Sequence, residues 1–212
     1  LAAQIYEDWA YEAALSQQIN DDVIEARRMA ITIWRTLGRM DKVGENLRWL
    51  SRLHWYRGEA VKANRYVQDA VEVLENEAPS AGKAMAYAVR AQFHMLQDHM
   101  AEAVEWGNKS LAMASTIDAH EVIAHALNTV GTARLFRGDA EGEQCLRESL
   151  RIARQHNLHE QAARVYTNLS ECAIEARQFD KAEALLKEGI AFDVEHDLDA
   201  WTYYLIGRHA QL

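Results

Sequence analysis

The chain has 212 residues, a single proline and a formal net charge of −9 at pH 7. This acidity argues against direct contact between this segment and nucleic acid, because proteins that track phosphate backbones are usually basic. No stretch approaches about 18 consecutive apolar residues, and no charged-then-apolar leader opens the chain, so we expect neither a membrane span nor a secretion signal.

The two cysteines, Cys145 and Cys172, lie far apart and outside any CxxC pair. This spacing fits a reducing compartment, and we expect a cytoplasmic protein without a disulfide framework. The sequence starts at Leu1 rather than at a methionine, which suggests a segment of a longer protein. The composition favours helix almost everywhere, and we expect essentially no sheet.

The strongest pattern along the chain is an internal repeat with steps of 37 to 40 residues. Small residues at matched depths let two helices approach closely, and bulky residues one turn away fill the space beside them. The repeat therefore predicts helical hairpins over residues 7–40, 44–80, 84–119, 124–158 and 163–196, followed by a half unit over 200–212. The first column of small residues is Ala14, Ser51, Ala91, Gly131, Ser170 and Gly207, and the second is Ala26, Ala63, Ala103, Gly142 and Ala182.

Turn signals separate the two helices of each hairpin. Gly58 and Gly138 can take the left-handed conformation that ends a helix, and Asp180 can cap the start of the next one. The proline, Pro79, falls between units, where Ser80 can cap the following helix.

The stretch HEVIAHALNTVG, from His120 to Gly131, has the look of a zinc-protease motif, but its spacing excludes that interpretation. Zinc-binding histidines lie four residues apart on one helical face, with a glutamate between them. His120 and His125 are five residues apart, which places the second ring about 140° around the helix from the first. We place His125 in the first helix of the fourth hairpin, and His120 in or beside the loop before it.

Two stretches of the fifth hairpin resemble the tetratricopeptide repeat (TPR) family. The run YTNLS from Tyr166 to Ser170 and the run RQFDKA from Arg177 to Ala182 look like the aromatic, small-residue and turn positions of such a repeat, although the usual unit has about 34 residues. Longer units of this kind resemble the repeat arms of bacterial regulators of the MalT and LuxR type. That resemblance implies an ATPase module before the repeats and a helix-turn-helix module after them. Arg90 and Gly107 depart from the usual residue types, and we expect the third unit to pack loosely.

Motifs of catalysis are missing from the sequence. It contains no GxxxxGK[ST] phosphate loop, no GxGxxG and no GxSxG elbow. Cys145 and Cys172 are best read as buried free thiols. The sequence therefore predicts a non-catalytic protein with no catalytic residues, no metal site and no cofactor.

The candidate binding surface is the concave groove, which the first helices of stacked hairpins line. Positions three residues before and one residue after the first small column face this groove and include Arg48 and Arg52. Trp55 or Tyr56 continues the same stripe. Two guanidinium groups beside an aromatic face can hold a carboxylate, a phosphate or a sugar ring, and the alternative is a surface stack with nothing bound. The other groove candidates are Gln92, Asn128, Thr132, Thr167, Glu171, Tyr204 and Arg208.

The sequence therefore predicts an all-α, right-handed superhelical solenoid of antiparallel hairpins. Its expected function is a non-catalytic ligand-binding or protein-binding module, the signal-reception arm of a cytoplasmic transcriptional regulator. The alternative is a generic TPR peptide-binding scaffold unrelated to transcription. Expected partners are a protein, a peptide or a small effector in the groove. Because the last helix lacks a partner helix, Trp201, Tyr203 and Ile206 would also favour self-association.

Overall fold

A computed structural model describes residues 1–15 and 19–212, so residues 16–18 of the expected first hairpin lie outside the described residues. The described residues form eleven helices and no strand. In chain order the helices are α1 (Ala2–Leu15), α2 (Asp21–Thr36), α3 (Met40–Tyr56), α4 (Ala60–Leu74), α5 (Ala81–Leu96), α6 (Met100–Thr116), α7 (His120–Phe136), α8 (Glu141–Gln155), α9 (His159–Glu175), α10 (Phe179–Glu195) and α11 (Asp199–His209).

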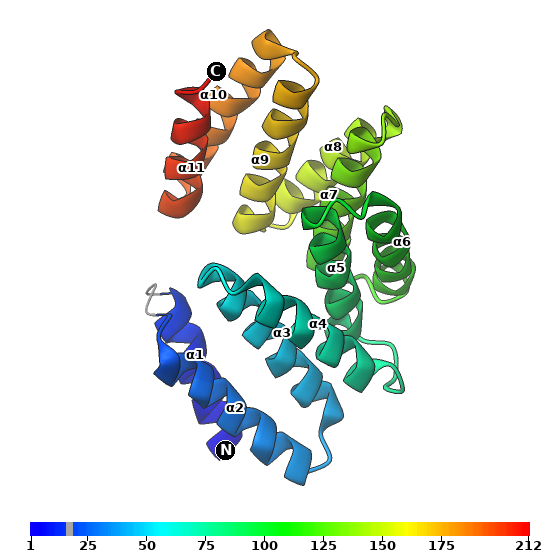
Figure 1. The fold of residues 1–212 in the computed structure, drawn as a ribbon, viewed down its shortest axis with the longest axis vertical. Helices are drawn as coiled ribbons and strands as arrows, with labels where there is room; N and C mark the ends of the chain where they lie inside the picture. The colour runs from blue at the N-terminus through cyan, green and yellow to red at the C-terminus, as the bar shows by residue number, and fades with distance from the viewer. Residues whose placement is uncertain (16–18) are drawn as a thin grey trace.

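Consecutive helices form pairs, and the pairs stack in a curved row. Figure 1 shows the row running from α1 and α2 at one end to α9, α10 and α11 at the other, with the two termini at opposite ends of the molecule. The first helices of neighbouring pairs contact one another, as α3 does α5, α5 does α7 and α7 does α9. The expected all-α solenoid is confirmed. The first helix of each of the five pairs begins three to five residues before the expected hairpin, because the small columns mark contact depth rather than helix ends.

The two small columns lie at the contacts between helices. All five members of the second column are buried, and so are Ser51, Ala91, Gly131 and Ser170 of the first. The backbones of α7 and α8 approach closely, because a methyl group added at Gly142 would lie 2.4 Å from the carbonyl oxygen of Gly131. Gly207 on α11 is exposed, with open space around it.

The third hairpin packs tightly, contrary to the expectation from its unusual residues. A methyl group added at Gly107 on α6 would lie 2.3 Å from Cγ2 of Val130 on α7. Glycine is therefore what lets these two helices meet. The Arg90 guanidinium lies 4.8 Å from the centre of the Trp106 ring, so a cation–π contact between α5 and α6 takes the place of an aliphatic one.

The turns agree with the sequence in most places. Gly58 and Gly138 have φ of 73° and 79°, and the Ser80 side chain accepts a hydrogen bond from the Lys83 backbone N–H at 3.2 Å. The prediction that Asp180 caps a helix is wrong, because α10 begins at Phe179 and Asp180 lies in its first turn. The left-handed residue Arg177 already turns the chain before this helix.

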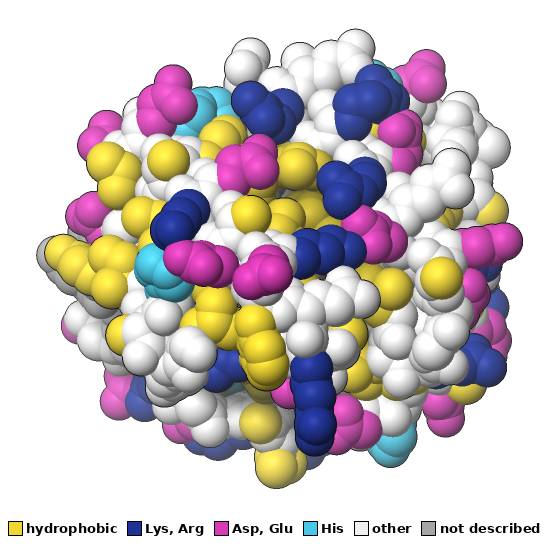
Figure 2. Space-filling model, turned by 90° about the horizontal axis from the view of Figure 1, so that it is seen from above, with side chains coloured by type: hydrophobic (Ala, Val, Ile, Leu, Met, Phe, Trp, Pro, Cys, Tyr) yellow, Lys and Arg dark blue, Asp and Glu magenta, His cyan; other side chains and the backbone are white. Residues whose placement is uncertain are grey.

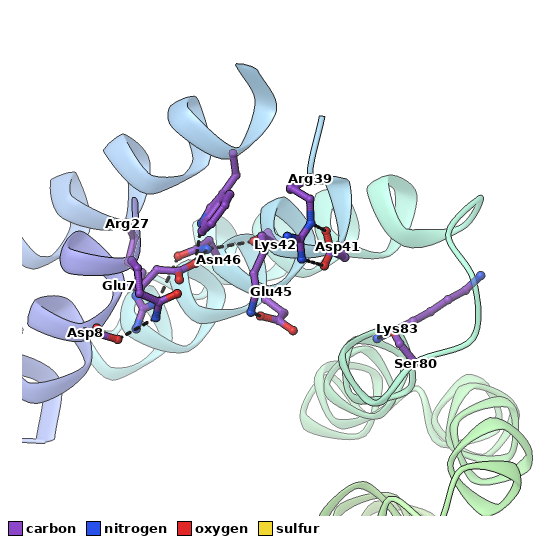
Figure 3. A network of polar contacts seen from close by, with 12 residues as sticks. Glu7, Asp8, Arg27, Arg39, Asp41, Lys42, Glu45, Asn46, Ser80 and Lys83 are labelled. Carbon is purple, nitrogen blue, oxygen red and sulfur yellow. Dashed lines mark hydrogen bonds and ion pairs between the residues drawn. The ribbon is translucent and has the colours of Figure 1, made fainter. Parts of the chain in front are cut away.

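A polar network fixes the first helices to one another (Figure 3). Glu7 of α1 accepts a hydrogen bond from Trp34 of α2 at 2.9 Å and another from Asn46 of α3. Asn46 in turn accepts from Arg27 of α2 at 3.1 Å. Both Arg27 and Asn46 are buried, so the network satisfies polar groups that water cannot reach.

Among the described helices, none has both the length and the apolar character that crossing a bilayer requires.

Candidate binding groove

A cavity of about 170 Å³ lies on the concave side of the solenoid, where five alternate helices face one another. Its walls come from α3, α5, α7, α9 and α11, so the first helix of every pair except the first contributes. Odd-numbered helices share this surface because small residues on their other faces bind them to the even-numbered helices. The lining residues are Arg48, Arg52, Trp55, Tyr56, Met85, Val89, Gln92, Phe93, Leu96, Glu121, His125, Glu160, Gln161, Arg164 and Trp201.

One wall of the cavity is basic, and its arginines pack around the Trp49 ring. The guanidinium groups of Arg48 and Arg52 on α3 lie 5.1 and 5.4 Å from the centre of the Trp49 ring. Arg27 of α2 lies 5.1 Å from the same ring. Cation–π contacts of this kind hold the long side chains in place without neutralising their charge. The cation–π contacts therefore position Arg48 and Arg52 and leave both of them charged.

An ion pair crosses the mouth of the groove. Nη2 of Arg52 lies 3.0 Å from Oε2 of Glu160 on α9, which is 108 residues further along the chain. Nε of Arg52 also donates to the Tyr56 hydroxyl at 3.0 Å. Burial lowers the pKa of Arg52, but the nearby Tyr56 and Glu160 groups outweigh it, so the net shift is upward. The second and fifth hairpins are thus linked directly across the groove.

The opposite wall holds a second arginine beside a histidine. Nη1 of Arg164 on α9 donates to Nδ1 of His125 on α7 at 2.9 Å. His125 is buried, and burial followed by repulsion from Arg164, Arg48 and Arg52 lowers its pKa well below 6.5. Its ring is therefore neutral at physiological pH, with the remaining proton on Nε2.

The arginines at this site sit in an environment that disfavours their charge. Burial lowers the pKa of Arg48 to about 10, with repulsion from Arg52 as the next cause. Burial also lowers the pKa of Arg164 to about 10, again with Arg52 contributing. Both groups stay charged at neutral pH, but each would gain from a neighbouring anion.

Most of the remaining lining is apolar, although Gln92, Glu121 and Gln161 also contribute. Met85, Val89, Phe93 and Leu96 come from α5, and Trp201 comes from α11. Phe93 meets the Trp55 ring edge to face, with ring centres 5.4 Å apart. The site therefore joins a charged wall to an apolar one, which suits a ligand with both characters.

The structure brings five of the eleven predicted groove residues to this cavity, namely Arg48, Arg52, Trp55, Tyr56 and Gln92. Their spacing along the helices was enough to predict that they line the groove, because these positions lie on the faces of α3 and α5 that meet the cavity.

Three of the other candidates are buried between helices rather than exposed in the groove. Asn128 is fully buried and accepts a hydrogen bond from Asn168 at 2.7 Å. Thr132 donates to the Asn128 carbonyl oxygen at 2.8 Å, and Thr167 is also buried. The expectation that they meet water or a peptide is wrong, because α7 and α9 pack against each other along these positions.

The last three candidates form a separate cluster between α9 and α11. The Tyr204 hydroxyl donates to Glu171 at 3.0 Å, and Nη2 of Arg208 donates to the same carboxylate at 2.7 Å. None of the three lines the cavity. Their contacts hold α11 to α9.

Sequence reasoning missed four cavity residues that share one repeat column. Met85, His125, Arg164 and Trp201 each lie six residues before a member of the first small column. That position is about one turn before the predicted groove positions, on the same helical face. Extending the predicted stripe by one turn would have found them. His125, set aside as a zinc ligand, is one of these residues.

Charged groups of both signs lie together on the face of the molecule that is seen from above. Figure 2 shows basic and acidic side chains close to one another on the face seen from above, with hydrophobic side chains between them.

Within the described part of the chain, no group of three or more His, Cys, Asp or Glu side chains is placed to hold a metal ion.

Comparison with known proteins agrees with this architecture. Residues 122–193, from α7 to α10, match the tetratricopeptide repeat family. A Rap protein complexed with competence and sporulation factor has a TM-score of 0.80 and 17% identity. The fold is TPR-like. The resemblance to the repeat family is confirmed for these residues, and the finer resemblance to MalT and LuxR regulators stays a prediction.

Two other solved structures share the fold. Aspartyl phosphate phosphatase F from Bacillus subtilis has a TM-score of 0.69 and 13% identity. A signal transduction ATPase with a tetratricopeptide repeat sensor, from Pyrococcus horikoshii, has a TM-score of 0.60 and 16% identity, with 97% of this chain and 34% of that chain covered. The match to the Rap protein covers 96% of this chain and 57% of the Rap protein. The match to the phosphatase covers 97% of this chain and 54% of the phosphatase. No curated protein sequence matches the chain.

Proposed function

We propose that this chain is a non-catalytic binding module whose concave groove takes a peptide, a protein segment or a small effector. The observation that carries the proposal is the cavity on the concave side, to which α3, α5, α7, α9 and α11 all contribute lining residues. A ligand there would touch four hairpins at once. Binding would therefore favour one curvature of the solenoid over others, provided that the ligand prefers that curvature.

The chemistry of the lining supports binding rather than catalysis. The charged residues are arginines and carboxylates, with Arg52 and Glu160 already joined to each other. The imidazole of His125 is tied to Arg164 through Nδ1. A general base needs a free lone pair within reach of a substrate proton, and this lone pair is occupied.

We further propose that the module is the signal-reception arm of a cytoplasmic transcriptional regulator. The similar structures include a Rap protein that holds competence and sporulation factor and an ATPase with a tetratricopeptide repeat sensor. These structures support the proposal, because one has this fold in complex with a factor and the other has it as a sensor. Sequencing the gene on both sides tests this part. A phosphate-binding loop before the repeats and a helix-turn-helix after them would support the regulator, whereas their absence would favour a general peptide-binding scaffold.

The groove itself is tested by selecting random peptides displayed on phage against the immobilised chain. Gln92→Trp places a large ring at the cavity wall, and we expect it to reduce retention of the selected peptides at least tenfold. Gln144→Trp makes the same substitution at an exposed position of α8 and should leave retention unchanged. Equal retention by both variants would place the binding surface elsewhere.

Self-association through α11 remains part of this proposal. Tyr203 and Ile206 are 71% and 47% exposed, whereas Trp201 is half-buried and lines the groove. We expect a concentration-dependent dimer in analytical ultracentrifugation that is lost in the double variant Tyr203→Ser, Ile206→Ser. A monomer at all concentrations would contradict it.

A further inference from the structure

Two buried donors on residues that line the groove have no acceptor. Nε of Arg48 is inaccessible to solvent and makes no hydrogen bond. Nε2 of His125 is in the same state, and it carries the ring proton because Nδ1 accepts from Arg164. A buried donor without a partner costs free energy, so such groups point to an acceptor that is supplied from outside.

Arg48 is the more informative of the two, because Glu45 and Glu121 attract it through space but neither forms an ion pair with it. Its guanidinium contacts the Trp49 ring but forms no ion pair or hydrogen bond with a described residue. Arg52 pairs with Glu160 at 3.0 Å, and Arg164 donates to His125, Gln161 and Thr129. Burial disfavours the charge of a guanidinium that has no ion pair, so an anion bound beside Arg48 would stabilise it.

The charge balance of the cavity limits the size of that anion's charge. Three arginines line the cavity, Arg48, Arg52 and Arg164, together with two carboxylates, Glu121 and Glu160. Because His125 is neutral, three positive and two negative charges leave a net charge of +1. A single negative charge completes the site, and a second one would face Glu121 and Glu160 without compensation.

The volume and the apolar wall limit the rest of the ligand. A cavity of about 150 Å³ can hold a benzene ring, and this cavity has about 170 Å³. Val89, Phe93 and Trp201 offer apolar contacts beside the charged wall. The remaining room therefore fits one compact apolar group.

We propose that the cavity binds a single carboxylate joined to a compact apolar group, with Arg48 and the Nε2–H of His125 as the donors that hold the carboxylate. The inference rests on the proposed function, since it names the ligand class of the same groove. Two sources share this chemistry. One is a free small organic acid, and the other is an acidic or C-terminal residue of a peptide.

The first experiment compares acids with neutral amides of the same shape on the unaltered chain. Benzoate and hexanoate are set against benzamide and hexanamide at about 10 mM, with thermal unfolding as the readout. If the acids bind with a dissociation constant of about 1 mM, they raise the melting temperature by about 3 °C, and the amides leave it unchanged. Equal shifts by acid and amide would overturn the proposal without any substitution.

The second experiment locates the anion. Arg48→Met keeps the aliphatic stem and removes the guanidinium, so we expect the benzoate-induced shift to disappear. Arg151→Met removes an exposed arginine of α8 that pairs with Glu148, and it should keep the full shift. The unliganded Arg48→Met protein should also melt no lower than the parent, because it loses a buried charge that has no partner. A lower melting temperature together with an unchanged benzoate shift would make Arg48 structural only.

The third experiment separates the two sources and distinguishes this inference from the proposed function. Pooled random pentapeptides, N-acetylated and with either a free or an amidated C-terminus, are passed over the immobilised chain and retained peptides are sequenced. Enrichment of free C-termini, or of Asp and Glu in the amidated pool, supports the peptide source, and benzoate should displace these peptides. Retention without any carboxylate preference overturns the inference and leaves the proposed function standing. Binding of benzoate without peptide retention supports the inference with a free acid as the ligand, and no binding of either overturns both.

Discussion

At the scale of single residues, Asp193 is an unusual member of the interior. It is fully buried on α10, and neither carboxylate oxygen has a hydrogen-bond partner. The equivalent positions eleven residues after the second small column hold Ala114 and Ala153 in the two preceding hairpins. Burial raises the pKa of Asp193 from 3.8 to about 6, with His196 acting in the opposite direction. The carboxyl group therefore opposes folding whenever it is ionised.

Replacing Asp193 should stabilise the folded protein by an amount that depends on pH. Because the pKa is higher in the folded state, the folded protein binds more protons between pH 4 and 6, and Asp193 destabilises it increasingly as pH rises through that range. We expect Asp193→Asn to raise the free energy of unfolding relative to the parent. This increase should be up to about 3 kcal/mol larger at pH 7.5 than at pH 4. Urea unfolding at both pH values measures it. Asp180→Asn, at an exposed position of the same helix, is the control, and a pH-independent difference for Asp193→Asn would contradict the prediction.

At the scale of helices, close approach at small residues decides how each hairpin closes. α7 and α8 meet at Gly131 and Gly142, where the backbone of one helix contacts the backbone of the other. A backbone atom cannot move aside as the end of a flexible side chain can. The contact between α7 and α8 therefore leaves no room for a larger residue. At Gly107 of α6 the obstacle is a side chain instead, Cγ2 of the buried Val130 on α7.

The two glycines of one repeat column predict opposite effects of the same substitution. In Gly131→Ala the new methyl group would lie 2.7 Å from a carbonyl oxygen and 2.9 Å from Leu146, and we expect a loss of about 1–3 kcal/mol. In Gly207→Ala no atom lies within 4 Å of the new group, so we expect a gain of up to about 1 kcal/mol from helix propensity. Thermal unfolding of both variants measures this, and a comparable loss in both would show that space is not the cause.

At the scale of the whole molecule, the ion pair between Arg52 and Glu160 closes the curve of the solenoid. It joins α3 to α9 across the groove, where its partners are 35% and 51% exposed. Its direct contribution to the free energy of unfolding should be below about 1 kcal/mol because water screens it. Its effect on shape is larger, since it connects the two ends of the groove.

Exchanging the charges tests this role. Glu160→Arg places two positive groups opposite each other, so we expect α3 and α9 to separate and the radius of gyration in small-angle X-ray scattering to increase. Adding Arg52→Glu restores opposite charges and should return the parent value. Helix content by circular dichroism should stay constant throughout. An unchanged radius of gyration in the single variant would show that packing alone sets the curvature.

Part of the groove could be predicted from the sequence, and the reason is local. Arg48, Arg52 and Tyr56 lie four residues apart on one helix, so their common face follows from helix geometry alone. Asn128 and Thr167 occupy the same repeat positions but are buried. The repeat column does not record how closely α7 and α9 approach, so it could not separate buried members from exposed ones.

The sequence by itself determined that the chain forms repeated helical hairpins, because small residues recurring at matched depths with bulky ones beside them favour one way of pairing helices. Only the tertiary structure decided which residues meet across the groove. Arg52 and Glu160 come together because small rotations between successive hairpins add up over the solenoid. Those rotations depend on packing between hairpins, for example where Gly107 admits Val130, and no single repeat contains that information.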